Sequence, residues 1–588
     1  MKNLKFYSLA TGAALAMGAT PTQAATPRAD KPNVIMILID DLSSFGVSAY
    51  GLESITSSQK HFTDEKLSTP NIDKLAQEGV LCSHAYSHAL SEATRVALMT
   101  GMNNGRNYIE TKALHESQIT YGDVFQANGY KTAVYGKWKQ SRGSIEVPAV
   151  RHISAFGWDD YSCFDMVYAN QRFINPDLVV NDKIENYNGR TDLDPATDRR
   201  WYGPDMFNRK TLEFIEKNQN DPFFIYYSLV LIHDDHKPTP DSKPRSVFDT
   251  TDESNKNDLR EYFPDMIRYT DKMIGRVVDK VEELGLRDNT IIIVMGDNGS
   301  KEFVTFRMKD GKVHKGGKGS TTYRGEQVPL IFSAPKLIPA AKGKDMRTYE
   351  PAVDITDIYP TIMTAAGIEI PNANKIDGVS LWSQLQGKSE EAHRPHIYKW
   401  YNANNTQNNL EVMMRYAQTP DFKYYAPNAD YPEGRFFDLR TDPEEIHGVK
   451  GRKLGWERYW YAGLDLKKLT PEQKKAYLEL KAEVDKHAYT KVKKIEITSA
   501  PSTIKAGEIA QLKDVVTPSN ATRNGVIWVS SDKSIATVDK FGRVKALKTG
   551  EVTITLHSWD DAWPVANGSK RGGYKVDGMK DQVKIKII

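Results

Sequence analysis

Four uninterrupted apolar segments constrain the fold of this chain more than any other feature of its sequence. They cover residues 34–39, 132–135, 223–232 and 290–295. Polar residues follow each segment, either directly or after a single glycine. Strands that are apolar along their whole length are buried on both faces, as in parallel sheets covered by helices. Helical patterns separate the segments, and the clearest runs from residue 265 to residue 284, between Pro264 and Gly285. Strands that alternate with helices predict an α/β sandwich.

Carboxylate and amide side chains follow two of these segments. Asp40 and Asp41 come directly after the first, and Asp297 and Asn298 follow the fourth. Ligands of open α/β sheets bind beyond the carboxyl ends of the strands, so we expect the two pairs to meet. Each pair by itself is more often a helix cap or a turn. Together they offer three carboxylates and one amide oxygen, which suit Ca²⁺ or Mg²⁺ rather than zinc. The sequence therefore predicts a metal site, with calcium ahead of magnesium.

A small polar residue, Ser91, opens a helix-like segment that runs to Gly101. Free N–H groups and the positive end of the helix dipole favour an anion at such a position. Arg95, one turn further on, adds a guanidinium that suits a tetrahedral oxyanion. A serine that opens a helix is more often only a helix cap. The segment therefore indicates anion chemistry only if other residues supply partners.

The same segment resembles the maturation motif of the sulfatase family, which belongs to the alkaline phosphatase superfamily. The matching residues are Ser91, Ala93, Arg95, Leu98, Thr100 and Gly101. The resemblance implies that Ser91 is oxidised to formylglycine (3-oxoalanine), whose hydrated aldehyde is the nucleophile and contacts the metal. A serine rather than a cysteine implies that the maturation enzyme, a partner of the chain, is of the anaerobic, radical type.

Three further segments resemble sulfatase motifs. Lys137 lies in Gly-Lys-Trp, His233 precedes Asp-Asp-His-Lys-Pro, and Lys318 begins Lys-Gly-Ser-Thr-Thr. The resemblance implies that the two lysines, with Arg95 and the metal, neutralise the sulfuryl oxygens. It also implies that Asp297 helps to deprotonate the nucleophile. His233, alone or with Lys318, would then protonate the leaving alcohol. Taken singly, these residues are more simply turn lysines and a structural histidine.

One position departs from the family pattern. Lys139 stands where sulfatases usually carry a histidine that helps the last step of the reaction. A lysine with its ordinary pKa of about 10.4 is a poor base at neutral pH unless burial or nearby cations lower that pKa. Lys139 is therefore either a perturbed base or a residue that binds substrate or sulfate. His236 and His314 are near enough in the sequence to substitute for the missing histidine.

The domain organisation follows from the same resemblances. Residues 25–390 are expected to form an alkaline-phosphatase-like α/β sandwich, and residues 391–490 a smaller α+β subdomain. Residues 493–588 alternate at the strand period and resemble the bacterial Ig-like group 2 family, which predicts an all-β sandwich. We expect this last module to be an attachment or spacer unit without catalytic residues. Residues 1–24 have the pattern of a secretory signal peptide, which predicts a periplasmic or secreted bacterial protein.

Composition excludes several classes of protein. The 588-residue chain has a formal net charge of +3, which does not indicate a nucleic-acid partner. Outside the leader there is no apolar run of about 18 residues, so no membrane span is expected. Cys82 and Cys163 are too few for a disulfide-built fold. We expect two buried thiols, with one disulfide as the alternative.

The sequence thus predicts an exported, metal-requiring sulfuric ester hydrolase that acts on sulfated carbohydrates. Two alternatives remain. One is a phosphodiester or phosphonate monoester hydrolase of the same superfamily, because the metal, the oxidised nucleophile and the tetrahedral anion are shared. The other is a catalytically silent protein that binds sulfated glycans, which the Lys139 departure and the C-terminal module suggest.

Overall fold

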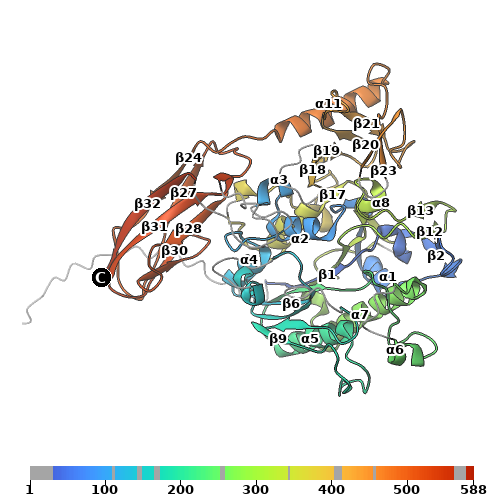
Figure 1. Cartoon of the computed structure of the whole chain (residues 1–588), viewed down its shortest axis with the longest axis horizontal. Helices are drawn as coiled ribbons and strands as arrows, with labels where there is room; N and C mark the ends of the chain where they lie inside the picture. Colours follow the sequence, from blue (N-terminus) through green and yellow to red (C-terminus); the bar gives the residue numbers. More distant parts are fainter. Residues whose placement is uncertain are drawn as a thin grey trace, which may run out of the picture.

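The computed structural model of this chain (Figure 1) describes residues 31–588 in ten segments. The residues it leaves undescribed are 1–30, 109–112, 142–148, 165–171, 252–257, 342–344, 372, 403–412, 455–457 and 562–577. The predicted signal peptide therefore lies outside the described residues. Within them, no helix is both long enough and apolar enough to span a membrane.

All four apolar segments are neighbouring strands at the centre of a ten-stranded sheet. The sheet has the order β16-β4-β15-β11-β1-β10-β6-β7-β8-β9. Its parallel core is formed by β11 (Thr290–Gly296), β1 (Asn33–Ile39), β10 (Phe223–Ser228), β6 (Lys131–Lys137) and β7 (Asp160–Phe164). The remaining strands are β4 (Gly79–Cys82), β15 (Leu330–Ser333), β16 (Arg347–Tyr349), β8 (Leu178–Val180) and β9 (Lys183–Glu185). The predicted α/β sandwich is confirmed.

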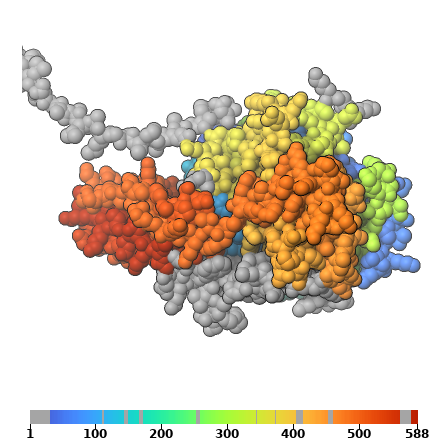
Figure 2. Space-filling view, turned by 90° about the horizontal axis from the view of Figure 1, so that it is seen from above, coloured from blue at the N-terminus to red at the C-terminus, as the bar shows by residue number. Residues whose placement is uncertain are grey.

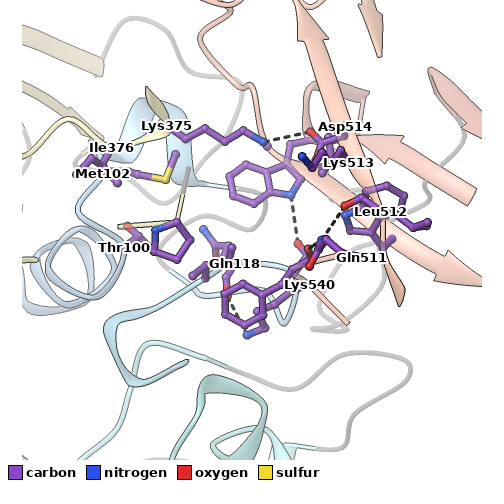
Figure 3. A pocket seen from close by; sticks show the side chains of 18 of the residues that line it. Thr100, Met102, Gln118, Lys375, Ile376, Gln511, Leu512, Lys513, Asp514 and Lys540 are labelled. Carbon is purple, nitrogen blue, oxygen red and sulfur yellow. Dashed lines mark hydrogen bonds and ion pairs between the residues drawn. The ribbon is translucent and has the colours of Figure 1, made fainter. Parts of the chain in front are cut away.

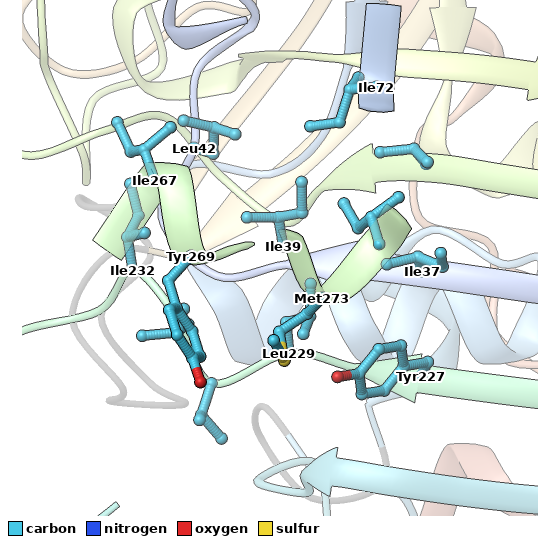
Figure 4. Packing of buried hydrophobic residues seen from close by; sticks show 14 of the residues in the cluster. Ile37, Ile39, Leu42, Ile72, Tyr227, Leu229, Ile232, Ile267, Tyr269 and Met273 are labelled. Carbon is cyan, nitrogen blue, oxygen red and sulfur yellow. The ribbon is translucent and has the colours of Figure 1, made fainter. Parts of the chain in front are cut away.

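Alternate side chains of β1 enter two different cores, which explains why the strand is apolar throughout. Ile37 and Ile39 pack with α1 (Pro70–Gln77), α5 (Gly203–Lys217) and α7 (Phe263–Glu283) on one face. Figure 4 shows this cluster, including Met273 of α7. Met36 and Leu38 pack on the other face. The helices there are α2 (Ser91–Thr100), α4 (Tyr121–Ala127) and α9 (Ile358–Ala365).

One predicted strand is too long. The third segment was expected to remain a strand up to residue 232, but β10 ends at Ser228. The reason lies in the neighbouring strand, because Gly136 is the last partner of β10 and takes φ +106. A Cβ at Gly136 would lie 1.8 Å from the carbonyl oxygen of Ser228, so the close approach requires glycine. Residues 229–232 leave the sheet but stay beside the end of β1, since the Ile232 N–H donates to the Asp40 carbonyl.

A smaller antiparallel sheet and a helix follow the main sandwich. The sheet contains β18 (Ile397–Asn402), β19 (Met413–Gln418), β20 (Phe422–Tyr425) and β21 (Arg435–Asp438). Helix α11 (Pro471–Lys486) packs on it through Leu480 and Val484. Seen from above, this subdomain, coloured orange, covers the middle of the molecule (Figure 2). Both cysteines are buried and unbridged, as expected for thiols.

In its described residues, 494–561 and 578–588, the C-terminal module is all-β apart from one short turn of helix. Its strands are β24 (Lys494–Ser499), β25 (Thr503–Ile504), β26 (Ile509–Gln511), β27 (Lys513–Thr517), β28 (Val526–Ser530), β29 (Ala536–Val538), β30 (Arg543–Ala546), β31 (Gly550–Ser558) and β32 (Lys580–Ile587). The module projects from one side of the sandwich (Figure 1). It packs there through Trp559 and Ile527 against Met102. A cavity of about 400 Å³ lies between the two domains (Figure 3).

Candidate active site

The two predicted ligand pairs meet where β1 and β11 end side by side. The Asp297 N–H donates to the Ile39 carbonyl at 3.1 Å, and the Asp41 N–H donates to Asp297 Oδ1 at 3.0 Å. The side-chain amide of Asn298 donates to Asp41 Oδ1 at 2.8 Å. With Asp40, these side chains are at most 1% exposed. We call Asp40, Asp41, Asp297 and Asn298 the oxygen cluster.

Ser91 is the first residue of α2, and its hydroxyl joins the oxygen cluster. Its Oγ donates to Asp297 Oδ2 at 2.6 Å. Arg95, one turn later, donates from Nε to Ser91 Oγ and from Nη2 to Asp297 Oδ2, both at 2.9 Å. Among the described residues no side chain caps this helix, whose N-cap is Leu90. The simple helix-cap interpretation of Ser91 is therefore wrong, because its hydroxyl bonds a carboxylate rather than the helix backbone.

The guanidinium of Arg95 is held from two directions. On one side it donates to Asp297, and on the other its Nη1 donates to Tyr226 Oη at 3.1 Å and to Ser228 Oγ. Both of these acceptors lie on β10, so the sheet fixes the rotamer of a helical arginine. Burial raises the pKa of Asp297, but the positive charges of Arg95 and Lys137 outweigh it, and the pKa lies below its usual range. Asp297 is therefore ionised.

Each of the first two aspartates has its own lysine. Lys137 ends β6, and its Nζ donates to both carboxylate oxygens of Asp40 at 2.8 and 2.7 Å. Lys318 reaches the cluster from the loop before α8 (Tyr323–Glu326) and donates to Asp41 Oδ2 at 2.6 Å. That loop is tied to the chain before Ser91, because the Gly319 N–H donates to the carbonyl of Ala89 at 2.9 Å.

Burial and charge act differently on the two aspartates. Burial raises the pKa of Asp40 to about 7 in spite of Lys137, and repulsion from Asp297 and Asp41 adds to the effect. Burial also raises the pKa of Asp41, but the charges of Lys318, His233 and Lys137 outweigh it, and the pKa falls well below its usual range. Of the three carboxylates, Asp40 is therefore the one whose charged form is least favoured in the free site.

His233 faces the cluster from the segment after β10. Its Nε2 is 4.0 Å from Asp41 Oδ2, and its Nδ1 is 2.6 Å from Asp234 Oδ1. Because Nδ1 also approaches the Asp234 carbonyl at 2.5 Å, we assign the ring proton to Nδ1, which leaves Nε2 facing the site. Burial lowers the pKa of His233 to about 3, and the charge of Arg172 adds to this effect.

Lys139, His236 and His314 are not bonded to the oxygen cluster among the described residues. Lys139 is half-buried two residues beyond Lys137, and among the described residues none of the oxygen cluster bonds its ammonium. His236 bonds Asp258, and the ring of His314 stacks on a phenylalanine, Phe45, with 3.9 Å between ring centroids. Among the described residues, neither histidine is bonded to the oxygen cluster. The role of Lys139 stays a prediction.

Sequence reasoning missed three cations at or near the site. Arg172 lies with Nη1 3.8 Å from Asp40 Oδ2, and no motif contains it. Lys399 and Lys423 are buried in the subdomain and donate to main-chain carbonyls of loops that lead into the site. A signal for the last two exists in the sequence, because a lysine inside an apolar, aromatic strand segment indicates a buried, paired charge.

The residues present fit a hard divalent cation. The side-chain oxygen Oδ1 of Asn298 is buried and accepts no hydrogen bond from the described residues. Asp40, Asp41 and His233 place potential ligand atoms within 4.8 Å of one another. Carboxylate oxygens next to an unused amide oxygen form the donor set that Ca²⁺ and Mg²⁺ prefer. The donor set therefore suits the metal predicted from the sequence.

An α/β sandwich whose parallel strands deliver a buried oxygen cluster, with a serine and an arginine at a helix start, defines a class of metal-assisted ester hydrolases. Comparison with family models makes this specific. The sulfatase model matches residues 32–368, the model of the N-sulphoglucosamine sulphohydrolase C-terminal region matches residues 323–457, and the bacterial Ig-like domain (group 2) model matches residues 491–562. The chain belongs to the sulfatase family, whose members hydrolyse sulfate esters, and carries an Ig-like domain.

Individual relatives have low sequence identity to this chain, but they match most of its length. Arylsulfatase D of Homo sapiens is 24% identical and covers 71% of this chain and 83% of its own length. N-acetylglucosamine-6-O-sulfatase of Bacteroides thetaiotaomicron is 24% identical, with 79% of this chain and 89% of its own covered. The solved structure of Ps i-CgsB in complex with k-i-k-neocarrahexaose superposes with a TM-score of 0.52 at 23% identity, over 71% of this chain and 88% of its own. The match to this solved structure supports the alkaline-phosphatase-like fold.

Proposed function

We propose that this sulfatase is an exported bacterial enzyme that hydrolyses sulfuric esters of carbohydrates with a formylglycine at position 91 and a bound Ca²⁺. One observation carries the proposal. The Ser91 hydroxyl, the Arg95 guanidinium and Asp297 are joined by hydrogen bonds of 2.6 to 2.9 Å inside the oxygen cluster. A residue at position 91 is thus held against both the proposed base and the proposed metal ligands.

The bound groups supply chemistry that serine and lysine lack. When present, Ca²⁺ held by Asp40, Asp41, Asp297 and Asn298 supplies a fixed positive charge, and the hydrated aldehyde at position 91 supplies the nucleophilic oxygen. The residues of the chain do the rest. Asp297 accepts the proton of the group at position 91, and Arg95 keeps that group oriented. Lys137 and Lys318 turn from their aspartates toward the sulfuryl oxygens and neutralise them.

His233 has the position of the group that protonates the leaving alcohol. Its Nε2 faces the site, while Asp234 fixes the ring through Nδ1. The low pKa of His233 in the free protein follows from burial and nearby cations. A bound sulfate ester brings negative charge next to the ring and favours its protonated form. His233 then holds a proton at Nε2 for the ester oxygen.

Two observations support a carbohydrate as the substrate. Relatives named above are an N-acetylglucosamine-6-O-sulfatase and a protein solved with neocarrahexaose. In addition, a polar hollow of about 280 Å³ lies beside Asp234, lined by Gln59, Asp258, Arg260 and Lys301 with the ring of Phe303. Amide, carboxylate and cationic side chains around an aromatic ring suit the hydroxyl groups and the faces of a sugar.

Further parts of the proposal concern organisation and location. We propose a signal peptide at residues 1–24, a catalytic domain at 25–390, a subdomain at 391–490 and the Ig-like domain at 493–588. The leader supports a periplasmic or secreted location. The family membership supports a dedicated maturation enzyme that converts Ser91. The side-chain chemistry supports calcium over magnesium as the resident ion, since Ca²⁺ accepts an irregular set of carboxylate and amide oxygens.

Parallel assays test the proposal. The chain co-expressed with a serine-type maturation enzyme should lose about 2 Da at the Ser91 peptide, because the alcohol becomes an aldehyde. Matured protein should hydrolyse an aryl sulfate faster than an aryl phosphodiester. A preference for the diester would favour a phosphodiester or phosphonate hydrolase instead. Modification without any turnover would favour a silent sulfated-glycan-binding protein.

Metal removal tests the calcium assignment separately. A ligand that binds only the folded chain raises its stability. Chelation with EGTA should therefore lower the melting temperature, and added Ca²⁺ should restore it more effectively than equal Mg²⁺. The Asn298→Ala variant should show a smaller response to Ca²⁺ than the wild type. Equal melting curves with and without the ion would contradict the assignment.

A further inference from the structure

Arg172 places a fourth cation beside the oxygen cluster, after Arg95, Lys137 and Lys318, and none of the sulfatase motifs gives it a role. It lies on the segment between β7 and β8. Its Nη1 is 3.8 Å from Asp40 Oδ2, and its side chain is 16% exposed. Its charge also acts on the proposed proton donor, since it contributes to the lowered pKa of His233. Arg172 therefore shares the space that Lys137 and His233 face.

Aromatic rings hold the Arg172 side chain in place. The guanidinium carbon lies 5.3 Å from the ring centroid of Phe164 and 6.0 Å from that of Phe173. A guanidinium packed on aromatic faces keeps its N–H donors free in the plane of the group. Phe164 pairs in register with Lys137 across β7 and β6. Adjacent strands thus position two cations that both approach Asp40.

Asp40 does not accept a hydrogen bond from Arg172. Lys137 already donates to both oxygens of Asp40, at 2.8 and 2.7 Å, and the 3.8 Å separation from Arg172 exceeds hydrogen-bond distance. Among the described residues, the buried Nη1 of Arg172 has no acceptor. A buried charged donor without an acceptor is costly, and a bound anion removes that cost. The donor lies where the proposed function requires an anion to bind.

We propose that Arg172 binds a sulfuryl oxygen of the substrate, so that Lys137 and Arg172 together hold the scissile sulfate. The inference rests on the proposed sulfatase function. It gives the site a guanidinium, held by Phe164 and Phe173, in addition to the lysines of the family motifs. The sulfate ester supplies the acceptor that the Arg172 Nη1 lacks in the free protein.

Sulfate binding and turnover test the proposal together. Isothermal titration of the Ca²⁺-loaded protein with inorganic sulfate should show at least about tenfold weaker binding for Arg172→Met, because a charge-assisted hydrogen bond is lost. Arg172→Lys keeps the charge without the planar donors and should lie between Arg172→Met and the wild type. With a monosulfated aryl ester, kcat/KM should fall by about 10- to 100-fold in Arg172→Met.

The monosulfated ester carries a single anionic group, which makes the assignment specific. If Arg172→Met turns it over as the wild type does and loses activity only on a disulfated saccharide, Arg172 binds a second anionic substituent and the proposal is wrong. Unchanged sulfate binding in Arg172→Met would also overturn it. Should Arg172→Met fail to fold, Arg172→Lys decides the matter by the same two measurements.

A matched control separates the site from general effects of removing an arginine. Arg190 also packs on aromatic rings, 5.1 Å from Tyr187 and 4.8 Å from Trp201, but outside the oxygen cluster. Arg190→Met should bind sulfate and turn over the ester as the wild type does. If the wild type itself neither binds sulfate nor hydrolyses the ester, the proposed function fails. If the wild type does both and Arg172→Met equals it, only the role of Arg172 fails.

Discussion

The two carboxylate oxygens of Asp297 accept hydrogen bonds from different elements. Oδ1 accepts the backbone N–H of Asp41 and thereby fixes the turn after β1. Oδ2 accepts the Ser91 hydroxyl and the Arg95 guanidinium and thereby fixes the start of α2. One carboxylate therefore connects two elements that each lie more than 200 residues before it in the sequence. Its charge also balances Arg95, which is fully buried.

Replacing Asp297 should damage both activity and stability. We expect Asp297→Asn to reduce turnover of an aryl sulfate at least about 100-fold, because an amide does not accept the proton. It should also lower the free energy of unfolding by about 3–5 kcal/mol, because Arg95 loses its buried counter-charge. Steady-state kinetics and urea unfolding measure the two effects. Asp192→Asn, which removes an exposed carboxylate paired with Arg190, should change neither.

A buried histidine near the site gives the fold a sensitivity to acid. His88 is fully buried, its ring stacks near Tyr401, and among the described residues neither ring nitrogen has a partner. Burial lowers the pKa of His88 to about 3, and the charge of Lys399 adds to the effect. Below about pH 6.5 the unfolded chain therefore binds one more proton at this position than the folded chain does.

The stability contributed by neutral His88 should be lost as the pH falls from about 6.5 toward 3. Each pH unit in that window costs about 1.4 kcal/mol. We expect His88→Phe, which keeps a planar ring without the titration, to have a shallower dependence of unfolding free energy on pH between 6.5 and 4. Urea unfolding at several pH values measures the slopes. Parallel slopes for the two proteins would show that His88 is not the group that titrates.

Two strands of the subdomain hold the loops that carry the site. On β18, Lys399 donates to the carbonyls of Tyr86 and Ser87, just before α2, at 3.0 Å each. On β20, Lys423 donates to the carbonyl of Thr321, in the loop that carries Lys318. Both lysines are at most 1% exposed. Buried cations that each bond main-chain carbonyls fix the position of a loop more firmly than apolar contact does.

Removing Lys423 should loosen that loop selectively. In Lys423→Met the Thr321 carbonyl loses the stronger of its two donors and keeps only the Tyr425 hydroxyl at 3.4 Å, and Glu445 loses its ion partner at 3.3 Å. We expect faster amide hydrogen exchange in residues 316–326 than in the core strands, because local opening becomes easier. Lys481→Met, on the outer face of α11, is the control and should leave that exchange unchanged. Uniform acceleration across the sheet would instead indicate global destabilisation.

At the scale of the whole molecule, the C-terminal module is docked rather than loosely tethered. Lys540 inserts into the α/β domain and donates to the carbonyls of Gln118 and Ala155 and to Asp123, at 2.9, 2.7 and 3.0 Å. Lys375 of the α/β domain pairs with an aspartate of the module across the cavity between the domains (Figure 3). The expectation of a simple spacer therefore omits a structural role. The residues of the oxygen cluster and its cations all lie outside the module.

Deletion of residues 491–588 should lower the thermal stability of the protein but leave its turnover of an aryl sulfate nearly unchanged. The truncated protein should turn over an aryl sulfate at a rate within about threefold of the wild type. The contacts that it loses lie away from the oxygen cluster, so they do not stabilise the transition state of the chemical step. Its melting temperature should fall by about 1 °C for each kcal/mol lost, because the entropy of unfolding is large in a chain of this size. Differential scanning calorimetry measures this. Lys540→Met should reproduce part of the fall, and the exposed Lys548→Met should not. A folded truncation without turnover would contradict the prediction.

Several features were predictable because they depend on local sequence. Alternate burial of β1 on two faces requires a continuous apolar run, and the helix α7 (Phe263–Glu283) follows from its periodicity and flanking residues. The end of β10 was not predictable, because it depends on Gly136 in the neighbouring strand. The partners of His236 and His314, which are Asp258 and Phe45, likewise depend on where loops pack.

The sequence by itself determined which side chains are delivered to one edge of a parallel sheet, since strand direction and the residue after each strand are local properties. Only the tertiary structure decided which of them touch. Ser91 bonds Asp297 across more than 200 residues, and Arg172, which no motif contains, reaches Asp40 because aromatic residues on and beside a neighbouring strand hold it there. Contacts of this kind depend on the packing of distant segments, and packing has no local pattern in the chain.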